Sequence, residues 1–452
     1  MKASDVRHRE YSYFPTETIC PPLPQRLRAV FTTSPMKNKK QRILPAAVSL
    51  ALVAWSPTVH AQQPFASLDN AAVSPQGAVR EQIGNPDATE ITLPAIEVVG
   101  RGESGAYHAH EASGTKSDLP LRELPQAVRV MSRQTLDDLG AVRVDDVLDY
   151  VGGVSRQNNF GGLWDNMAIR GLAGDINNGM PLLRNGFSAN RGFNAPRDTA
   201  NIERIEFLKG PAAALYGASE PGGTLNVVTK KPSRKVANAL ELYVGSDEFY
   251  RTALDSTGPL SESIAYRLNV ALEDRGSFRD FVDTRRTLFA PALTWRLSPS
   301  TVLDYNGELL RHRTPLDRGV VAVNGQLGVI PRDRFLGEPA DGDVQVENQT
   351  HQFVLEHMVS PDWSARMGLS YKRGAVEGFS TEPISVQGDG RTLLRQRRHR
   401  DYASEDLALQ GELIGRFQLG QIGHELVVGA ETYRMDFDQR MLRINAGASY
   451  AI

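Results

Sequence analysis

The chain has 452 residues, one cysteine and a formal net charge of −2. A chain of this length can form two hydrophobic cores, and its near-neutral charge gives no sign of a nucleic-acid partner or an acidic tail. The single cysteine, Cys20, excludes an internal disulfide and argues against thiol chemistry, so any metal site would need histidines and carboxylates.

The segment that begins at Met36 has the features of a secretory signal peptide. A basic start precedes an apolar run at 43–55, and small residues stand before Gln62 in positions that suit cleavage. The run is too short to cross a bilayer as a helix, and we prefer a signal peptide to the alternative of a buried core helix. We therefore predict a signal peptide at 36–61, a wrongly assigned upstream extension at 1–35, and an exported mature protein.

Residues 62–117 are rich in Ala, Gly, Ser and Glu and are predicted to form a flexible linker. The group His108, His110 and Glu111 has the spacing of metal ligands, but no second cluster partners it, so we favour a solvated linker and predict no metal site. The stretch "LPAIEVVG" at 93–100 is β-prone and cannot form a core of its own. Such a segment can pair with the sheet edge of another protein by strand addition.

Residues 118–232 are predicted to form a compact α/β domain. Strands are expected at 126–132, 167–172, 182–188, 205–208 and 225–230, and short helices at 132–140 and 145–153. The stretch "IERIEFLKGPAAALYGASEPGGTLNVVTKKP" at 202–232 is rich in glycine but matches neither phosphate-binding glycine pattern. We found no other catalytic motif, so the sequence predicts neither an enzyme nor catalytic residues.

From residue 236 onward, apolar and polar residues alternate in nine segments of about ten residues each, the length of a tilted strand that crosses an outer membrane. They lie near 237–246, 249–257, 264–273, 287–297, 302–312, 350–359, 363–374, 404–417 and 423–436. Short turns alternate with long polar loops at 313–349 and 375–403, which favours a membrane barrel over the alternative of a soluble β-sandwich. The run "RQRRHR" at 395–400 is expected in the second long loop, either simply solvated or in contact with lipopolysaccharide phosphates.

Five stretches resemble, in order, the energy-coupling box, the plug and the first barrel strands of TonB-dependent ferric-siderophore receptors. They are "TLPAIEVVG", "TKSDLPLRELPQAVRVMS", "MAIRGL", the 202–232 stretch and "GPLSESIAYRLNVALEDRGSFRDFV". The resemblance covers about residues 91–436. It implies an outer-membrane antiparallel β-barrel, incomplete in this chain, with an N-terminal α/β plug domain at 118–232 and barrel strands at 236–452.

The resemblance also implies partners, cargo and location. The protein would lie in the outer membrane of a Gram-negative bacterium, in contact with lipid and lipopolysaccharide, and would import ferric siderophores with energy from TonB and ExbB–ExbD. Iron would be carried as the siderophore ligand, with no resident cofactor and no nucleic-acid partner. Heme, vitamin B12 or sugar remain alternative cargoes, whereas a passive porin would need no plug and a signalling receptor would need a longer segment before the box.

Three groups of candidate site residues follow. By resemblance, the TonB box consists of Leu93, Pro94, Ala95, Ile96, Glu97, Val98 and Val99, and Arg170 and Arg204 would tie the plug to glutamates of later barrel strands. The polar, aromatic loops "RQNNFGGLWDN" and "SANRGFNAPRD" are expected to face outward and touch an anionic or neutral chelate. The predicted ligand contacts are Arg156, Asn158, Phe160, Trp164, Asn190, Arg191 and Phe193.

Nine strands are too few to close around such a plug, because a lumen of that size needs about 22 strands and an open sheet edge is not tolerated in hydrocarbon. The last residues, "GASYAI", also lack the terminal aromatic that the family uses for barrel assembly. We therefore predict an N-terminal part of a receptor of roughly 700 residues, which alone would neither insert nor transport. A non-functional truncated receptor is the corresponding alternative.

Overall fold

The computed structural model describes residues 112–116, 120–124, 126–173, 182–189, 192–210 and 221–451. All of these residues belong to one compact unit, Asp87–Ile452. The predicted upstream extension, signal peptide, TonB box and His108–His110–Glu111 group lie outside the described residues. Within the described residues, no helix has the length and apolarity needed to cross a membrane.

A five-stranded sheet in the order β1-β7-β8-β5-β6 forms the centre of the N-terminal α/β region. Its strands are β1 (Ala127–Ser132), β5 (Leu182–Arg184), β6 (Phe187–Ser188), β7 (Ile202–Lys209) and β8 (Gly223–Thr229). Only β5 and β8 run parallel among these neighbours. The mixture of strands and short helices in this region confirms the α/β prediction, and we call it the plug.

Short helical and sheet elements complete the plug. Helix α1 (Arg133–Asp138) begins where the Ser132 hydroxyl accepts a hydrogen bond from the Thr135 amide, and Gly140, with a φ of +60°, follows its end. The other elements are the 3-10 turns η1 (Ser113–Thr115), η2 (Leu121–Glu123) and η3 (Val144–Tyr150), and a small sheet of β2 (Val154–Arg156), β3 (Met167–Ile169) and β4 (Leu172–Ala173). One apolar core joins α1 and η3 to the larger sheet through Leu136, Val147, Ile205 and Phe207.

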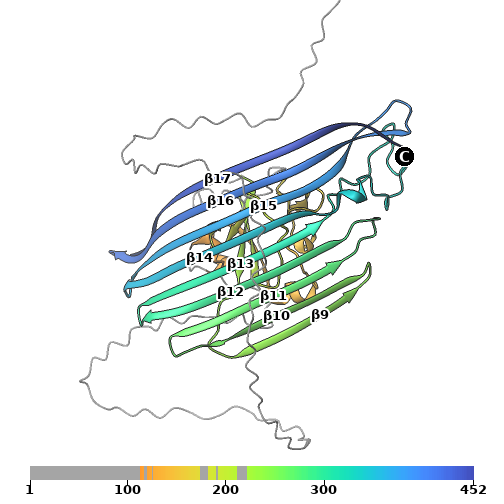
Figure 1. The fold of residues 1–452 in the computed structure, drawn as a ribbon. Coiled ribbons are helices and arrows are strands. Elements are labelled where there is room, and N and C mark those ends of the chain that lie inside the picture. The colour runs from red at the N-terminus through yellow and green to blue at the C-terminus, as the bar shows by residue number, and fades with distance from the viewer. Residues whose placement is uncertain are drawn as a thin grey trace, which may run out of the picture. The chain divides into compact units, whose positions relative to one another are not determined.

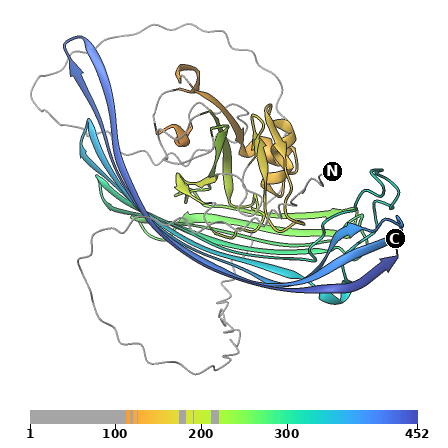
Figure 2. The same ribbon diagram turned by 90° about the horizontal axis from the view of Figure 1, so that it is seen from above.

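The rest of the described chain is a nine-stranded sheet in which each strand pairs antiparallel with the next (Figure 1). Its strands are β9 (Ala237–Gly245), β10 (Phe249–Pro259), β11 (Ile264–Arg275), β12 (Thr284–Ser298), β13 (Thr301–Thr314), β14 (Val344–Ser360), β15 (Trp363–Val386), β16 (Thr392–Leu419) and β17 (Ile422–Ala451). The plug lies against one face of this sheet (Figure 2). The structure thus confirms all nine predicted strands.

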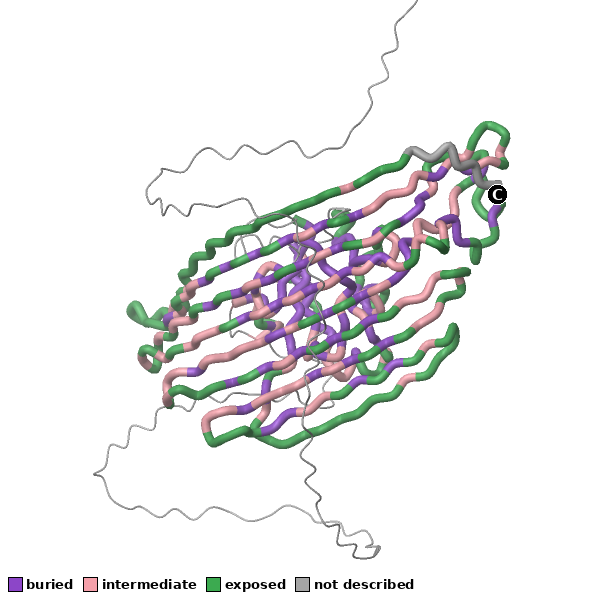
Figure 3. Tube along the Cα trace, in the orientation of Figure 1, coloured by how far each residue is buried: buried purple, intermediate pink, exposed green. Residues whose placement is uncertain are grey.

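Exposed and buried residues alternate along much of β10 to β16 (Figure 3), and many of the buried ones are polar. On β11, Leu272 is 52% exposed whereas the adjacent Glu273 is 5% exposed. On β12, Phe289 is exposed and Arg286 is buried. A soluble β-sandwich would bury the apolar face instead, so this arrangement supports strands that meet lipid on the outside and a polar interior on the inside.

The prediction of a long loop at 375–403 is wrong. Strands β15 and β16 extend through this range and stay paired as far as Val386 and Leu393, which leaves a short connection at 387–391. The segment was misread because charged residues occupy both faces of these strand ends, so the expected alternation is absent. Backbone pairing and ion pairs such as Arg397–Asp341 stabilise the extension where an apolar outer face is not needed. The "RQRRHR" run therefore lies in β16.

A short η4 turn (Pro339–Asp341) lies within the remaining long connection, 315–343, between β13 and β14. From β11 onward the connections alternate in length along the sheet. Those at 260–263, 299–300, 361–362 and 420–421 join strands at one end, and those at 246–248, 276–283, 315–343 and 387–391 join them at the other. Alternating short turns and longer loops are typical of outer-membrane barrels, and the predicted loop near 313–349 is confirmed.

Candidate functional site

A buried ion network joins the plug to the sheet. Asp198 of the plug accepts hydrogen bonds from Arg251 of β10 at 2.6 Å and 2.7 Å and from Arg286 of β12 at 3.0 Å. Glu273 of β11 pairs with the same two arginines, at 3.1 Å and 2.6 Å. All four side chains are at most 2% exposed. We call these four residues the Asp198 network.

The Asp198 network balances two positive charges with two negative charges, which makes its burial tolerable. Burial opposes ionisation of Asp198, but the two guanidinium groups outweigh it and hold the pKa of this carboxyl below its ordinary value of 3.8. Asp198 is therefore ionised at neutral pH. Removing its charge would leave two arginines facing a single carboxylate away from water.

Further contacts hold the plug segment 192–195 against β14 and β16. The Asn348 side chain donates to the Phe193 carbonyl and accepts from the Ala195 amide, both at 2.6 Å. The Phe193 amide donates to the Ser404 hydroxyl at 3.1 Å. Together with the Asp198 network, these bonds fix the plug's register on the inner face of the sheet.

Gly374 of β15 lets this segment approach the sheet closely. A Cβ atom at residue 374 would collide with the Phe193 carbonyl oxygen and crowd Ser404. We expect Gly374→Ala to increase the hydrogen-exchange rate of the backbone amides in plug segment 192–195, because the segment must move away from β15. The matched control is Gly411→Ala in β16, where an added Cβ meets nothing within 4 Å. Equal exchange in both variants would contradict the contact described here.

A second group, rich in arginine, lies where β15 and β16 extend beyond the shorter strands. Glu382 of β15 pairs with Arg318 of the 315–343 connection at 2.8 Å, and with Arg398 and Arg400 of β16 at 3.1 Å and 2.6 Å. Glu382 and Arg400 are almost fully buried, whereas the Arg318 and Arg398 side chains are about one-fifth exposed. We call these four residues the Glu382 cluster.

Phe160 brings the plug into contact with the Glu382 cluster. Its ring stacks on Trp164, with centroids 4.2 Å apart, and the guanidinium carbons of Arg318 and Arg400 lie 4.1 Å and 5.3 Å from its centre. The turn that carries Phe160 is tied to the sheet, because the His312 ring nitrogen Nε2 lies 2.9 Å from the Gly162 carbonyl oxygen. A group that binds at these arginines is therefore close to the plug.

The predicted ligand contacts occupy different environments. Phe160, Trp164 and Phe193 are 8%, 5% and 2% exposed and belong to a core cluster shared with the sheet. Their buried partners come from distant strands; the Tyr402 ring, for example, lies 5.1 Å from the Phe193 ring. Their contact with a ligand stays a prediction.

The remaining predicted ligand contacts are polar. Arg156 is part-exposed and pairs with Asp145 and Asp149 of η3, both at 2.9 Å, which keeps it within the plug. The Asn158 side chain accepts from the Phe160 amide at 2.8 Å and so shapes the turn that presents Phe160. Asn190 and Arg191 lie outside the described residues.

Among the described residues, Arg204 and Arg170, the two predicted plug–barrel arginines, lie in different surroundings within the plug. Arg204 pairs with Glu206 of its own strand at 2.8 Å. Glu206 is fully buried and also accepts hydrogen bonds from the backbone of η1 and from Asn226. Arg170 is exposed in a left-handed turn, with a φ of 53°. Their expected ties to glutamates of later barrel strands stay a prediction.

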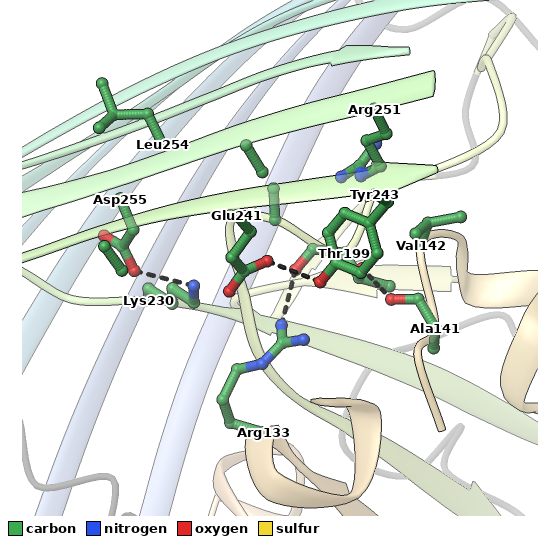
Figure 4. A pocket seen from close by; sticks show the side chains of 13 residues that line it. Arg133, Ala141, Val142, Thr199, Lys230, Glu241, Tyr243, Arg251, Leu254 and Asp255 are labelled. Atoms are coloured by element: carbon green, nitrogen blue, oxygen red, sulfur yellow. Dashed lines mark hydrogen bonds and ion pairs between the residues drawn. The ribbon is translucent and has the colours of Figure 1, made fainter. Parts of the chain in front are cut away.

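A small pocket lies between the plug and strands β9 and β10 (Figure 4). Several of its polar groups bind each other or neighbouring carbonyls. Lys230 pairs with Asp255 at 2.8 Å, Tyr243 donates to Glu241 at 2.8 Å, and Arg133 donates to the Thr199 carbonyl at 2.8 Å. These contacts join the end of the plug to the first two strands.

A plug bound through buried charges to the polar inner face of antiparallel, membrane-length strands is typical of a plugged outer-membrane β-barrel, of which the described residues form nine strands of an open sheet. Residues 120–224 match the family model described as the TonB-dependent Receptor Plug Domain. The chain belongs to the TonB-dependent receptors, as the resemblance implied.

Similarity to curated relatives and to solved structures supports this family assignment. The chain is 43% identical to the Metal-pseudopaline receptor CntO of Pseudomonas aeruginosa UCBPP-PA14, over 80% of this chain and 51% of that protein. It is 30% identical to the Ferripyoverdine receptor of P. aeruginosa PAO1, over 76% and 43% of the two chains. The pyoverdine outer membrane receptor FpvA bound to pyoverdine shares the fold, with a TM-score of 0.68, 24% identity and coverage of 78% and 52%. The chain spans about half the length of the curated relatives it matches.

Proposed function

We propose that this protein takes part in importing metal chelates, with ferric siderophores as the cargo class, across the outer membrane of a Gram-negative bacterium. The observation that carries this proposal is the plug held on the inner face of the sheet by the Asp198 network. An open pore in that membrane would leak, so a plugged barrel must change its conformation to pass a bulky ligand. The end of the sheet with the longer connections would face outward.

Energy for this movement must come from the periplasmic side, because the outer membrane has no supply of ATP. We propose that TonB, with ExbB–ExbD, supplies it by pairing with the box at residues 93–99. The exposed apolar outer face would contact lipid and lipopolysaccharide. In this proposal the protein is a transport receptor without catalytic activity, iron enters as cargo with no resident cofactor, and no nucleic acid takes part.

The second candidate is a chelate of another transition metal. A relative with 43% identity is named as a receptor for metal-pseudopaline, whereas relatives of lower identity are named for ferrioxamine or ferripyoverdine. Both candidates need the same plug and the same coupling to the inner membrane. They differ only in the metal whose limitation makes the protein necessary for growth.

Deleting the gene is expected to abolish growth on at least one ferric siderophore as sole iron source, because a bulky chelate needs a receptor to cross the outer membrane. The measurement is growth of parent, deletion and complemented strains under iron limitation with a panel of ferric siderophores, with iron-replete medium as control. A defect confined to limitation of another metal would favour the second candidate. Unchanged growth under every metal limitation would contradict the proposed function.

A further inference from the structure

The Glu382 cluster holds three positive charges against one negative charge. Arg318, Arg398 and Arg400 each bind Glu382, and among the described residues no second carboxylate pairs with any of them. The neighbouring basic residues Arg395 and Arg397 have acids of their own, Glu338 and Asp341. The surplus of two positive charges is therefore located at the Glu382 cluster.

Such a surplus is costly in a buried place unless something binds there. Arg400 has a fully buried side chain, and its Nε atom has no hydrogen-bond partner. Leaving a buried charged donor unsatisfied costs free energy of folding. An incoming chelate with more than one negative charge would satisfy this donor and offset more of the surplus charge than Glu382 does alone.

The geometry suits a carboxylate in particular. Guanidinium groups are planar donors that match the two oxygens of a carboxylate, and Glu382 already occupies this arrangement with its own carboxylate. Arg318 and Arg398 are part-exposed, so a ligand can reach them before it reaches Arg400. Glu382 therefore holds the place that a carboxylate of a ligand could take.

We propose that the Glu382 cluster binds chelates that carry free carboxylates, by exchange of a ligand carboxylate for Glu382. This inference rests on the proposed function and narrows its cargo to anionic chelates. The cluster faces Phe160 of the plug, 4.1 Å from the Arg318 guanidinium, and not the outer surface of the sheet. Lipopolysaccharide phosphates, which surround a barrel from outside, are therefore not its ligand.

Binding at the cluster also acts on the plug. Phe160 has a left-handed backbone, with a φ of 54°, and a Cβ atom on the next residue, Gly161, would crowd Leu316 and Asp317 of the 315–343 connection. This close packing, together with the cation–π contact of Arg318, holds the turn in a strained conformation. A ligand that draws Arg318 toward itself releases part of that constraint.

The test is chelate binding to the receptor, expressed from its own gene and purified in detergent. The two probes are ferric citrate, which keeps free carboxylates, and a neutral ferric trihydroxamate, in which three hydroxamates offset the charge of Fe³⁺. The parent is expected to bind ferric citrate more tightly, and added salt should weaken that binding while leaving the trihydroxamate unaffected. This comparison needs no variant and therefore does not depend on a variant folding.

Variants then locate the site. Glu382→Gln removes the internal competitor and is expected to tighten ferric citrate binding about tenfold, whereas Arg400→Gln should weaken it about tenfold or more, because a hydrogen bond to a charged group is lost. Arg397→Gln is the matched control, since Arg397 lies in the same strand but pairs with Asp341. Binding of the trihydroxamate should be the same in all three variants.

Four outcomes would overturn the inference. They are a parent receptor that does not prefer ferric citrate, variants that alter both chelates equally, an Arg397→Gln effect as large as that of Arg400→Gln, and displacement of ferric citrate by purified lipopolysaccharide. Each leaves the proposed function standing as long as the gene is still needed for growth on some metal chelate. Loss of that requirement would instead contradict the proposed function itself.

Discussion

Replacing Asp198 by asparagine is expected to destabilise the packing of the plug against the sheet by about 3–5 kcal/mol. The substitution breaks a buried ion network and leaves two arginines facing one glutamate. The measurement is hydrogen exchange of plug amides near residue 198 in the purified receptor. If these amides exchange by local opening, the loss of free energy corresponds to roughly 150- to 4,000-fold faster exchange at neutral pH.

The control for this prediction is Asp149→Asn, the same substitution in a plug residue whose side chain is 66% exposed. Arg156 keeps its second partner, Asp145, in that variant, so the expected change is below about 1 kcal/mol. The pKa of Asp198 also fixes the direction in which this stabilisation changes with pH. Because the folded-state pKa of Asp198 lies below 3.8, its stabilisation is fully present above that pH and is lost as the pH falls through the folded-state value. Similar exchange in the two variants at neutral pH would contradict the proposed importance of the network.

Replacing Ile96 or Val98 by proline is expected to abolish energised uptake and leave chelate binding at the parent level. Proline removes a backbone donor, so the box could no longer add a strand to the sheet of TonB. The measurement is accumulation of a labelled ferric chelate by cells, compared with binding to the same cells after their proton gradient has been collapsed.

Two matched variants separate this effect from a general effect of proline. Ile96→Val keeps the backbone donor, and Ala71→Pro places proline in the predicted linker outside the box. Both are expected to take up chelate normally. Parent-level uptake by Ile96→Pro and Val98→Pro would show that the coupling segment lies elsewhere.

Local patterns in the sequence predicted much of the fold. Period-two alternation located all nine strands, since a strand with one lipid-facing side must alternate. Cap and stop residues such as Ser132 and Gly140 located α1. Alternation failed only between about residues 375 and 403, at the paired ends of β15 and β16, because strand ends that leave the apolar layer carry charges on both faces.

The site residues were harder to predict because they come from segments far apart in the chain. Arg251 and Glu273 lay within predicted strand segments and Arg286 just before one, and nothing local indicates that Asp198 meets them. One signal was present: three neighbouring strands carry buried charges on the same face, which is costly unless a partner of opposite charge fills the interior. Glu382 was missed for a simpler reason, since it lay in a segment interpreted as a loop.

The most direct test of the central claim is accumulation of labelled ferric chelates by host cells that contain or lack the gene, measured before and after collapse of the inner-membrane proton gradient. A plugged, TonB-coupled receptor predicts accumulation of at least one chelate that requires both the gene and the gradient, and that is lost in Ile96→Pro. Accumulation of every chelate that is independent of the gene, or that persists after the gradient has collapsed, would contradict it.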